Sequence, residues 1–315
     1  MKNFFFVFCL SFFILGCTKR DDPTFNNTFT KVTGYPSSSS SFMTILRDTV
    51  IIASNNYSMN NSGKIYTSSN GEKWNTMKVV GDGQYRSLIS YKDELYISTT
   101  DKIYCSNTMS NTWTEKSNGL SGNIYISSLV GTDAGLFTCG TSLFRSIDNG
   151  NNWTEITIPG LLEASSIVSI NNTLIACITK SSEVGLYRSD DDGATWTYIN
   201  SPLTNHFKWK LFILNNVVHA MSSMNSVILS SYDSGKTWSR ESPNGLTVKG
   251  PNIIQSIELN TGIMYAATKN GVFKSNDNGR NWIYMGCWDV QSLCIKDNII
   301  YAGTAEQGLW FSPTK

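Results

Sequence analysis

Residues 189–196 read Ser-Asp-Asp-Asp-Gly-Ala-Thr-Trp, and residues 231–238 read Ser-Tyr-Asp-Ser-Gly-Lys-Thr-Trp. Both octapeptides follow the pattern S-x-D-x-G-x-T-W. Residues 146–153 (SIDNGNNW) and 275–282 (SNDNGRNW) keep the pattern with Asn in place of Thr, and residues 67–74 (TSSNGEKW) and 106–113 (SNTMSNTW) are weaker copies that retain the tryptophan. Six copies in one register identify an internal repeat, and internal repeats point to arrays of small structural units.

Each octapeptide has the composition of a β-hairpin turn. Glycine supplies a positive φ, the Asp or Asn side chain bonds to the backbone of its own turn, and the tryptophan begins the return strand. The tryptophan also offers a large area for burial between sheets. We therefore expect structural roles for the shared positions, which are Asp148, Asp191, Asp233, Asp277, Trp153, Trp196, Trp238 and Trp282.

A second aligned segment lies upstream of the octapeptides, for example at residues 95–99 and 136–140. It reads as a buried strand, and its fourth position is always small. A ring of small residues at one level is what close packing of adjacent sheets requires. The residues at this position are Ser98, Cys139, Cys177, Ala220, Ala267 and Gly303.

The spacing of the repeat gives the number of units. The octapeptide tryptophans at positions 74, 113, 153, 196, 238 and 282 are separated by 39 to 44 residues. A seventh unit runs from Trp288 through Trp310 and stops before a last strand, while residues 26–32 parallel residues 151–157 at the other end of the chain. We predict seven four-stranded units arranged in a ring, with residues 28–33 completing the last one and covering its edge.

The octapeptide resembles the Asp-box, or BNR repeat, of a β-propeller superfamily that includes sialidases, xyloglucanases and photosystem assembly factors. The resemblance covers residues 26–315 and implies an all-β, seven-bladed β-propeller of antiparallel blades. In such a blade the loops after the second strand and after the outermost strand share one face. The octapeptides lie on the opposite face, so we expect the first face to bind ligands.

The N-terminus has the features of an export signal. The apolar run of twelve residues at 4–15 is too short to span a bilayer but fits a secretory signal. Residues 14–17 (ILGC) resemble the bacterial lipobox, which implies a signal peptide over 1–16, a lipidated Cys17 and a tether over 17–25. The charged segment that follows is similar to signals that send Gram-negative lipoproteins to the outer face of the outer membrane, although a solvated tether has the same composition. These features predict an outer membrane lipoprotein of the cell envelope, exposed at the surface.

Composition limits the partners. With 25 Lys and Arg against 24 Asp and Glu, the net charge is +1, and no basic block is present, so nucleic acid is not an expected partner. Five cysteines remain beyond Cys17, an odd number at irregular spacing, which predicts buried fillers and not a disulfide framework. His206 and His219 are the only histidines, and His219 lies in a strand expected in the core. We therefore expect no metal, no cofactor and a monomer.

The expected ligand face carries aromatic and basic residues. Exposed Trp and Tyr form protein hot spots and sugar-stacking platforms, although some of them are expected to pack between blades. Tyr57 belongs to this aromatic set. The residues predicted to contact a ligand are Tyr85, Arg86, Tyr125, His206, Trp209 and Trp288.

Catalysis is the competing interpretation. Sialidases of the superfamily clamp a carboxylate with three arginines on six blades, whereas only Arg86 is expected to point toward the central channel here, so a sialidase is disfavoured. Xyloglucanase-type hydrolases use paired carboxylates in a cleft between two propellers, and this chain has one. The acids available on the same face are Asp82, Glu163, Glu183, Asp289 and Glu306, of which Asp289, Glu163 and Glu306 are the catalytic candidates. The leading hypothesis is a non-enzymatic binding or scaffold module for a protein or glycan, the alternatives being a glycoside hydrolase or a structural subunit of an envelope complex.

Overall fold

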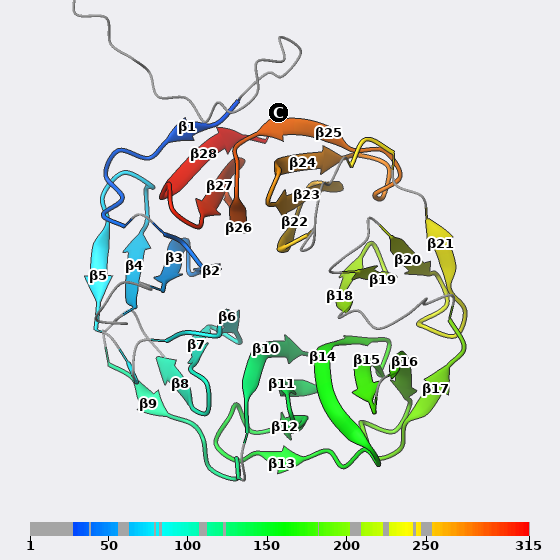
Figure 1. Ribbon diagram of the computed structural model, residues 1–315. Helices are drawn as coiled ribbons and strands as arrows, with labels where there is room; N and C mark the ends of the chain where they lie inside the picture. The colour runs from blue at the N-terminus through cyan, green and yellow to red at the C-terminus, as the bar shows by residue number, and fades with distance from the viewer. Residues whose placement is uncertain are drawn as a thin grey trace, which may run out of the picture.

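The protein is an all-β, seven-bladed β-propeller (Figure 1). The computed structural model describes residues 28–314 except for 38, 56–62, 79, 82–83, 107–111, 122–123, 182, 202–208, 223–226, 242–243 and 247–253. In this part of the chain there are 28 strands, which form seven four-stranded sheets, and there is no helix. All pairings within the sheets are antiparallel, so the fold predicted from the repeat is confirmed.

The first six blades each contain four consecutive strands, ordered from the ring centre outward. Blade 1 consists of β2 (Phe42–Leu46), β3 (Thr49–Ser54), β4 (Lys64–Ser68) and β5 (Asn75–Met77). Blade 2 consists of β6 (Ser87–Tyr91), β7 (Glu94–Ser98), β8 (Ile103–Ser106) and β9 (Thr114–Glu115). Blade 3 consists of β10 (Ile126–Thr132), β11 (Gly135–Gly140), β12 (Phe144–Ser146) and β13 (Thr154–Glu155).

The second half of the ring repeats this order. Blade 4 consists of β14 (Leu161–Ile170), β15 (Thr173–Lys180), β16 (Glu183–Ser189) and β17 (Thr197–Ile199). Blade 5 consists of β18 (Trp209–Leu214), β19 (Val217–Ser222), β20 (Ile228–Ser231) and β21 (Ser239–Glu241). Blade 6 consists of β22 (Ser256–Asn260), β23 (Ile263–Thr268), β24 (Gly271–Ser275) and β25 (Ile283–Gly286).

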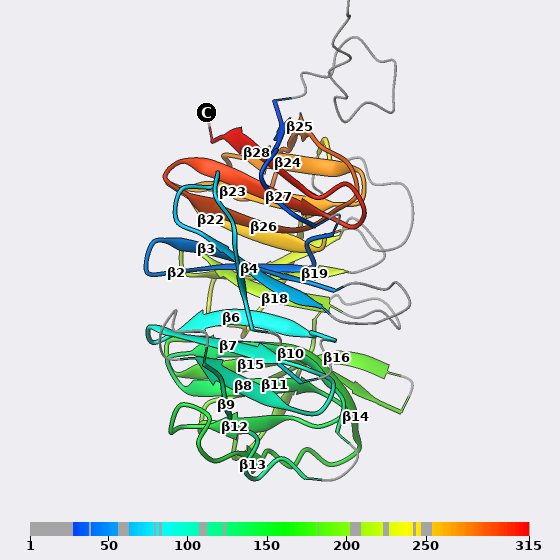
Figure 2. The ribbon, with the colours of Figure 1, turned by 90° about the vertical axis from the view of Figure 1, so that its left-hand side faces the viewer.

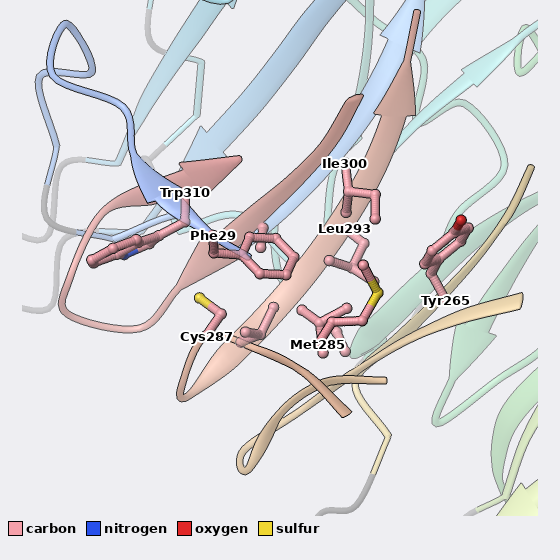
Figure 3. Close-up of a cluster of buried hydrophobic side chains, with 11 residues drawn as sticks. Phe29, Tyr265, Met285, Cys287, Leu293, Ile300 and Trp310 are labelled. Carbon is pink, nitrogen blue, oxygen red and sulfur yellow. The ribbon is translucent and has the colours of Figure 1, made fainter. Parts of the chain in front are cut away.

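Blade 7 joins the two ends of the chain. Its strands are β26 (Val290–Lys296), β27 (Ile299–Thr304), β28 (Leu309–Pro313) and, at the outer edge, β1 (Thr30–Lys31). Lys31 lies opposite Trp310 in the antiparallel ladder. Phe29 is 5% exposed and belongs to the same buried cluster as Trp310 (Figure 3). The predicted closure of the ring by an N-terminal strand is therefore confirmed.

The two faces of the ring differ in their connections. Tight turns between the first and second strands carry paired positive φ angles, as at Asn215 (47°) and Asn216 (62°), and they share one face with the octapeptide turns. We call this the box face. The loops after the second and fourth strands form the opposite side, which we call the loop face. In Figure 2 the turn between β2 and β3 marks the box face at the left, and the ends of β14 and β16 extend toward the loop face at the right.

The core consists of clusters that bridge neighbouring blades. One cluster combines Val168 and Cys177 of blade 4 with Leu211 and Ala220 of blade 5, and the other clusters repeat this arrangement. The ring of small residues is fully buried, and a Cβ on Gly303 would come within 2.5 Å of the Ser40 Cβ. This close approach explains why the position holds only small side chains. The five cysteines of the described chain are buried and form no disulfide with one another, as expected of fillers.

Candidate functional site

The octapeptides form self-contained turns, which we call box turns. In blade 4 the Ser189 hydroxyl donates to Asp191 Oδ1 at 2.8 Å and accepts from the Gly193 amide at 2.8 Å. Asp191 also accepts from the amide and the hydroxyl of Thr195, and Trp196 Nε1 donates to the Gly193 carbonyl at 3.0 Å. In blade 4 every polar group that the repeat pattern specifies is thus used within its own turn, whereas in blade 3 Trp153 Nε1 donates to the Lys116 carbonyl at 2.7 Å.

The box aspartates are held in their ionised form. Hydrogen bonds from Asn152 lower the pKa of Asp148 to about 2, and those from Thr195 lower the pKa of Asp191 to about 2. Desolvation opposes the effect at Asp233, but the bonds from Thr237 prevail and lower its pKa to about 2 as well. A carboxylate that accepts several such bonds from its own turn is a turn component, so these acids act within the scaffold.

A link between blades emerges from the structure at the box turns. Arg145 Nη1 donates at 2.6 Å to the carbonyl of Asp192, which precedes the glycine of the next blade's box turn. Arg188 Nη1 donates to the carbonyl of Ser234 at the equivalent position one blade further on. The Tyr96 hydroxyl, which donates to Glu94 Oε2 at 2.6 Å, also lies 3.0 Å from the Asn149 carbonyl, again the equivalent position. Three successive box turns are therefore each contacted by the preceding blade.

The run of three aspartates at 190–192 is used within these links. Asp190 accepts two hydrogen bonds from the Arg188 guanidinium, at 2.6 and 2.9 Å, and a third from the Thr173 hydroxyl. Asp192 forms an ion pair with Arg145 at 3.6 Å. These carboxylates have protein partners, which agrees with the interpretation of the run as part of the repeat.

On the loop face, Arg86 and Tyr125 come together between blades 2 and 3. The Arg86 guanidinium lies over the Tyr125 ring, 5.1 Å from its centroid, and donates to the Thr100 hydroxyl from Nε and Nη2 at 3.4 Å. Tyr125 is 40% exposed, and its amide donates to the Thr141 hydroxyl at 2.9 Å. A planar cation stacked on an exposed ring is a preorganised surface for polar ligands.

Trp288 lies on the loop face between blades 6 and 7. Its neighbours Cys287 and Asp289 both have positive φ, at 62° and 53°, and the Trp288 side chain is 41% exposed. The Asp289 amide donates to the Lys269 carbonyl at 2.9 Å, and its carbonyl accepts from the Ala305 amide at 3.2 Å. The indole is thus presented to solvent by a backbone that is fixed on both sides.

Two of the predicted contact residues are buried. Tyr85 is 1% exposed and packs with residues of blades 1 and 2, and Trp209 is 4% exposed and packs between blades 4 and 5. Their side chains offer no surface to a ligand, because each is inserted between two sheets at the start of an innermost strand. Their prediction as surface contacts is therefore corrected. His206, Tyr57 and Asp82 lie outside the described residues.

The three candidate catalytic acids do not all lie close together. Asp289 Oδ1 accepts a hydrogen bond from Gln291 Nε2 at 3.2 Å, and Glu306 is exposed in the turn between β27 and β28, next to the Ala305 amide that bonds Asp289. Glu163 is half-buried in β14, across the ring from blade 7 (Figure 1). Asp289 and Glu306 are therefore neighbours in the backbone, whereas Glu163 is separated from both.

Two charged residues of the innermost strands were not predicted from the sequence as candidate site residues. Lys210 of β18 donates from Nζ to the Gln255 carbonyl of blade 6 at 2.8 Å, and desolvation by the surrounding blades lowers its pKa. Desolvation also raises the pKa of Glu258 in β22 to about 7, although the charge of Lys210 opposes the shift. Alignment of the innermost strands would have marked Glu258 as a charge among uncharged equivalent residues, whereas the positions equivalent to Lys210 include the polar Gln255 and the charged Arg86.

His219 is a core residue, as expected. It is 1% exposed, stacks on Phe212 with ring centroids 5.0 Å apart, and shares a hydrogen bond with the Ser230 hydroxyl at 3.0 Å. Burial lowers its pKa to about 4, so the ring is neutral at physiological pH. It belongs to the scaffold and not to a catalytic group.

A depression of about 510 Å³ lies on the box face and not on the expected ligand face. It is polar, and the described residues around it include the linking Arg145 and the exposed Ile147. Its remaining lining residues are Lys92, Asp133, Ala134, Gly135, Ser169, Asn172, Asp190, Asp191 and Asp192. Within the described ranges no group of three His, Cys, Asp or Glu side chains is placed to hold a metal ion. The same part of the chain contains no helix long and apolar enough to cross a membrane.

The fold defines the class of the molecule as a seven-bladed β-propeller. No family model matches the sequence, and no curated protein matches it either. Solved structures do match the fold. They include YCF48 bound to D1 peptide, with a TM-score of 0.66 and 13% identity over 92% of this chain and 98% of that one.

Two further structures widen the comparison. The extracellular domain of the putative one component system BT4673 from B. thetaiotaomicron has a TM-score of 0.68 and 14% identity, and the match covers 90% of this chain and 40% of that one. Virginiamycin B lyase from Staphylococcus aureus has a TM-score of 0.69 and 15% identity over 90% of this chain and 98% of that one. At these identities the likeness concerns the fold alone, and the proteins that share it include a peptide-bound propeller and an enzyme.

Proposed function

We propose that this propeller is a non-enzymatic binding or scaffold module of the cell envelope, which contacts a protein or glycan with its loop face. The observation that carries the proposal is the stacked pair of Arg86 and Tyr125, with Tyr125 40% exposed. Tyr125, Leu162 and Trp288 are exposed large hydrophobic residues that lie on the loop face in different parts of the ring. Aromatic and arginine side chains of this kind dominate the energetics of recognition surfaces.

The likeness to a peptide-bound propeller supports this choice without identifying the ligand. YCF48 is bound to D1 peptide in its solved structure, so this fold accommodates a polypeptide ligand. In the present chain the exposed aromatic residues suit either a peptide or a sugar ring, because both are recognised by stacking. The box face, in contrast, uses its polar groups for links between blades.

The experiment is affinity capture from envelope extracts, with a glycan array in parallel. Arg86→Ala, Tyr125→Ala and Trp288→Ala should each weaken the captured interaction at least tenfold if these residues are hot spots. Tyr232→Ala is the matched control, since Tyr232 is 59% exposed on the box face. Unchanged capture by the three loop-face variants would contradict the proposal.

A glycoside hydrolase is the second candidate. It is favoured by Asp289, which has a fixed backbone, follows the exposed Trp288 and has Glu306 as a neighbour. Paired acids beside an aromatic platform are the usual arrangement for glycan cleavage. Release of reducing sugar from envelope polysaccharides, abolished by Asp289→Asn, would establish this candidate and overturn the binding proposal.

The membrane attachment is part of the same proposal. Cys17 and the tether over 17–25 lie outside the described residues. Acyl chains on Cys17 would hold the propeller to the outer membrane as a monomer with its ligand face free, each buried CH₂ contributing about 0.8 kcal/mol. Mass spectrometry of the mature N-terminus tests this, and release of a Cys17→Ser variant into the soluble fraction is the expected outcome.

A further inference from the structure

The main chain around Arg86 is bonded to two blades. The residue before it, Tyr85, is fixed by the side chain of Asn55 in blade 1, which donates from Nδ2 to the Tyr85 carbonyl at 2.8 Å and accepts from the Tyr85 amide at 2.9 Å. The Arg86 amide donates to the Ser98 carbonyl of blade 2 at 2.8 Å. These bonds fix the point on the loop face from which the Arg86 side chain extends.

The side chain of Arg86 is oriented by contacts with two further loops. Its guanidinium donates from Nε and Nη2 to the Thr100 hydroxyl at 3.4 Å and lies over the ring of Tyr125, 5.1 Å from the centroid. The two loops are bonded to each other, because the Ile126 amide donates to the Thr100 carbonyl at 2.7 Å. The Tyr125 carbonyl also accepts from the Thr141 amide at 3.2 Å. The guanidinium therefore has a defined position before a ligand binds.

The guanidinium has hydrogen-bond donors to spare. Arginine carries five N–H donors, and here one on Nε and one on Nη2 are directed at the same hydroxyl oxygen. The other N–H groups of Nη1 and Nη2 have no acceptor among the described residues. No carboxylate in that part of the chain lies within 4 Å of the guanidinium, and this includes Asp101, the residue after Thr100. The Arg86 charge is thus stacked and half-buried without being neutralised.

The free end of the guanidinium matches a carboxylate. One N–H of Nη1 and one of Nη2 lie parallel in the guanidinium plane, so both oxygens of a carboxylate can accept from this fork. Such charge-assisted hydrogen bonds are about twice as strong as neutral ones. The Tyr125 ring covers one face of the cation, which keeps water from that side and strengthens the pairing.

The stacked geometry favours a peptide carboxylate over a sugar carboxylate. A sugar ring gains affinity by stacking on an aromatic face, and Arg86 already covers one face of Tyr125. A sugar stacked on the opposite face would have the phenol ring between its carboxylate and the guanidinium. The carboxylate of an Asp or Glu side chain needs no stacking and reaches the fork edge-on. We propose that Arg86 binds an acidic polypeptide segment, with a side-chain carboxylate of that segment paired to Nη1 and Nη2.

This inference rests on the proposed function of the loop face and names the chemistry of its partner. Binding of a purified acidic peptide tests the inference, whereas capture from envelope extracts tests the proposed function. Capture that requires Tyr125 but is not displaced by the acidic peptide would overturn the inference and leave the proposed function standing. Saturable binding of the peptide without capture of any envelope component would support the inference and contradict the proposed function.

The experiment is a calorimetric titration of the mature chain at pH 7 with an oligo-glutamate peptide as probe. Oligo-glutamine of the same length is the uncharged control, and oligogalacturonate supplies carboxylates on sugar rings. Oligo-glutamate is expected to bind saturably and more tightly than oligogalacturonate, and oligo-glutamine is expected not to bind. This comparison uses the wild-type protein alone, so it does not depend on the folding of any variant.

Variants then separate the fork from its charge. Arg86→Gln should weaken the binding of oligo-glutamate about ten- to a hundredfold, as expected for the loss of a bidentate charged contact. Arg86→Lys, which keeps the charge without the fork, should weaken it about fivefold or more. Arg280→Gln removes an equal charge from an exposed residue of the box face and should leave the affinity unchanged. Urea denaturation of each variant checks that the fold is retained.

Several results would overturn the proposal. Absence of saturable binding by oligo-glutamate would do so, as would binding of oligo-glutamine or tighter binding of oligogalacturonate. Unchanged affinity in Arg86→Gln or Arg86→Lys would show that the fork is not used. An equal loss of affinity in Arg280→Gln would show that the peptide responds to net charge and not to Arg86.

Discussion

The guanidinium of Arg145 in β12 donates from Nη1 to the main-chain carbonyl of Asp192, 2.6 Å away in the box turn of the next blade. The same guanidinium donates from Nε and Nη2 to the Ala134 carbonyl of its own blade, at 2.9 and 2.7 Å. One side chain thus ties two adjacent sheets together at the box face. The box turn both reverses its own hairpin and serves as the acceptor that fixes the neighbouring blade.

Replacing Arg145 tests the energetic weight of this link. Arg145→Met would leave two carbonyls without their charged donor, so we expect a loss of about 2–4 kcal/mol in the free energy of unfolding. Arg280→Met is the matched control, because Arg280 lies in a box turn with an exposed side chain, and its effect should stay within about 0.5 kcal/mol. Urea denaturation of both variants measures the difference. Equal denaturation midpoints of Arg145→Met and Arg280→Met would show that the link between blades does not stabilise the fold.

The box aspartates should make the fold sensitive to acid. Asp233 has a pKa of about 2, below the ordinary value of 3.8, so the folded state binds fewer protons than the unfolded state between these values. Its contribution is complete above pH 4 and is lost as the pH falls toward 2. Asp233→Ala should destabilise the protein by about 1–3 kcal/mol at pH 7 and by less at pH 2.

Denaturation of the Asp233→Ala variant at both pH values is the measurement. Asp101→Ala serves as the control, because Asp101 is exposed on the loop face outside any box turn. A destabilisation by Asp233→Ala that is the same at pH 2 and pH 7 would contradict the assigned role.

Glu258 should produce a pH dependence of the opposite sign. Its pKa is raised from 4.5 to about 7, so the folded state holds a proton that the unfolded state has lost in this window. Stability therefore falls as the pH rises from 4.5 through 7, by about 3 kcal/mol at most, and the loss is complete above pH 7. In Glu258→Gln this part of the slope should vanish.

Thermal unfolding between pH 5 and pH 8 measures the effect. The Glu306→Gln variant, altered at an exposed acid, should retain the wild-type slope. If Glu258→Gln and the wild type show parallel profiles, Glu258 does not carry the shift.

Closure of the ring should depend on Phe29. Its side chain is 5% exposed in the cluster that holds Trp310 and Met285, so Phe29→Ala should cost about 3–5 kcal/mol (Figure 3). Thr30→Ala, at an exposed position of β1, should cost much less. Chemical denaturation and limited proteolysis near the N-terminus measure the stability of both variants. If Phe29→Ala is as stable as Thr30→Ala, β1 does not hold the ring closed.

The repeat made most of the fold predictable. The octapeptides set the hairpin turns, their spacing set the number of blades, and the similarity of the segment around Phe29 to that around Trp153 identified the closing strand. The small residue at Gly303 was predictable for the same reason, because it recurs at one position of each unit. Local repeats of this kind determine backbone topology directly.

The candidate site was less predictable, because it depends on side-chain directions that the repeat does not encode. Trp209 is the first residue of β18 and Tyr85 lies just before β6, and both side chains are buried between blades, whereas Tyr125 and Trp288 remain exposed. The reach of Arg145 to the next blade depends on the distance between sheets, which no local pattern reports. Lys210 and Glu258 gain their significance only when the innermost strands are placed around one centre.

The central claim is that ligands contact the loop face. The most direct measurement places a photo-crosslinking amino acid at the position of Tyr125 or Trp288 on that face, and in matched proteins at Tyr232 or Ile147 on the box face, followed by irradiation in the native envelope. Discrete adducts, to protein or to glycan, are expected from positions 125 and 288 and none from positions 232 and 147. Adducts formed from the box-face positions alone, or equally from both faces, would contradict it.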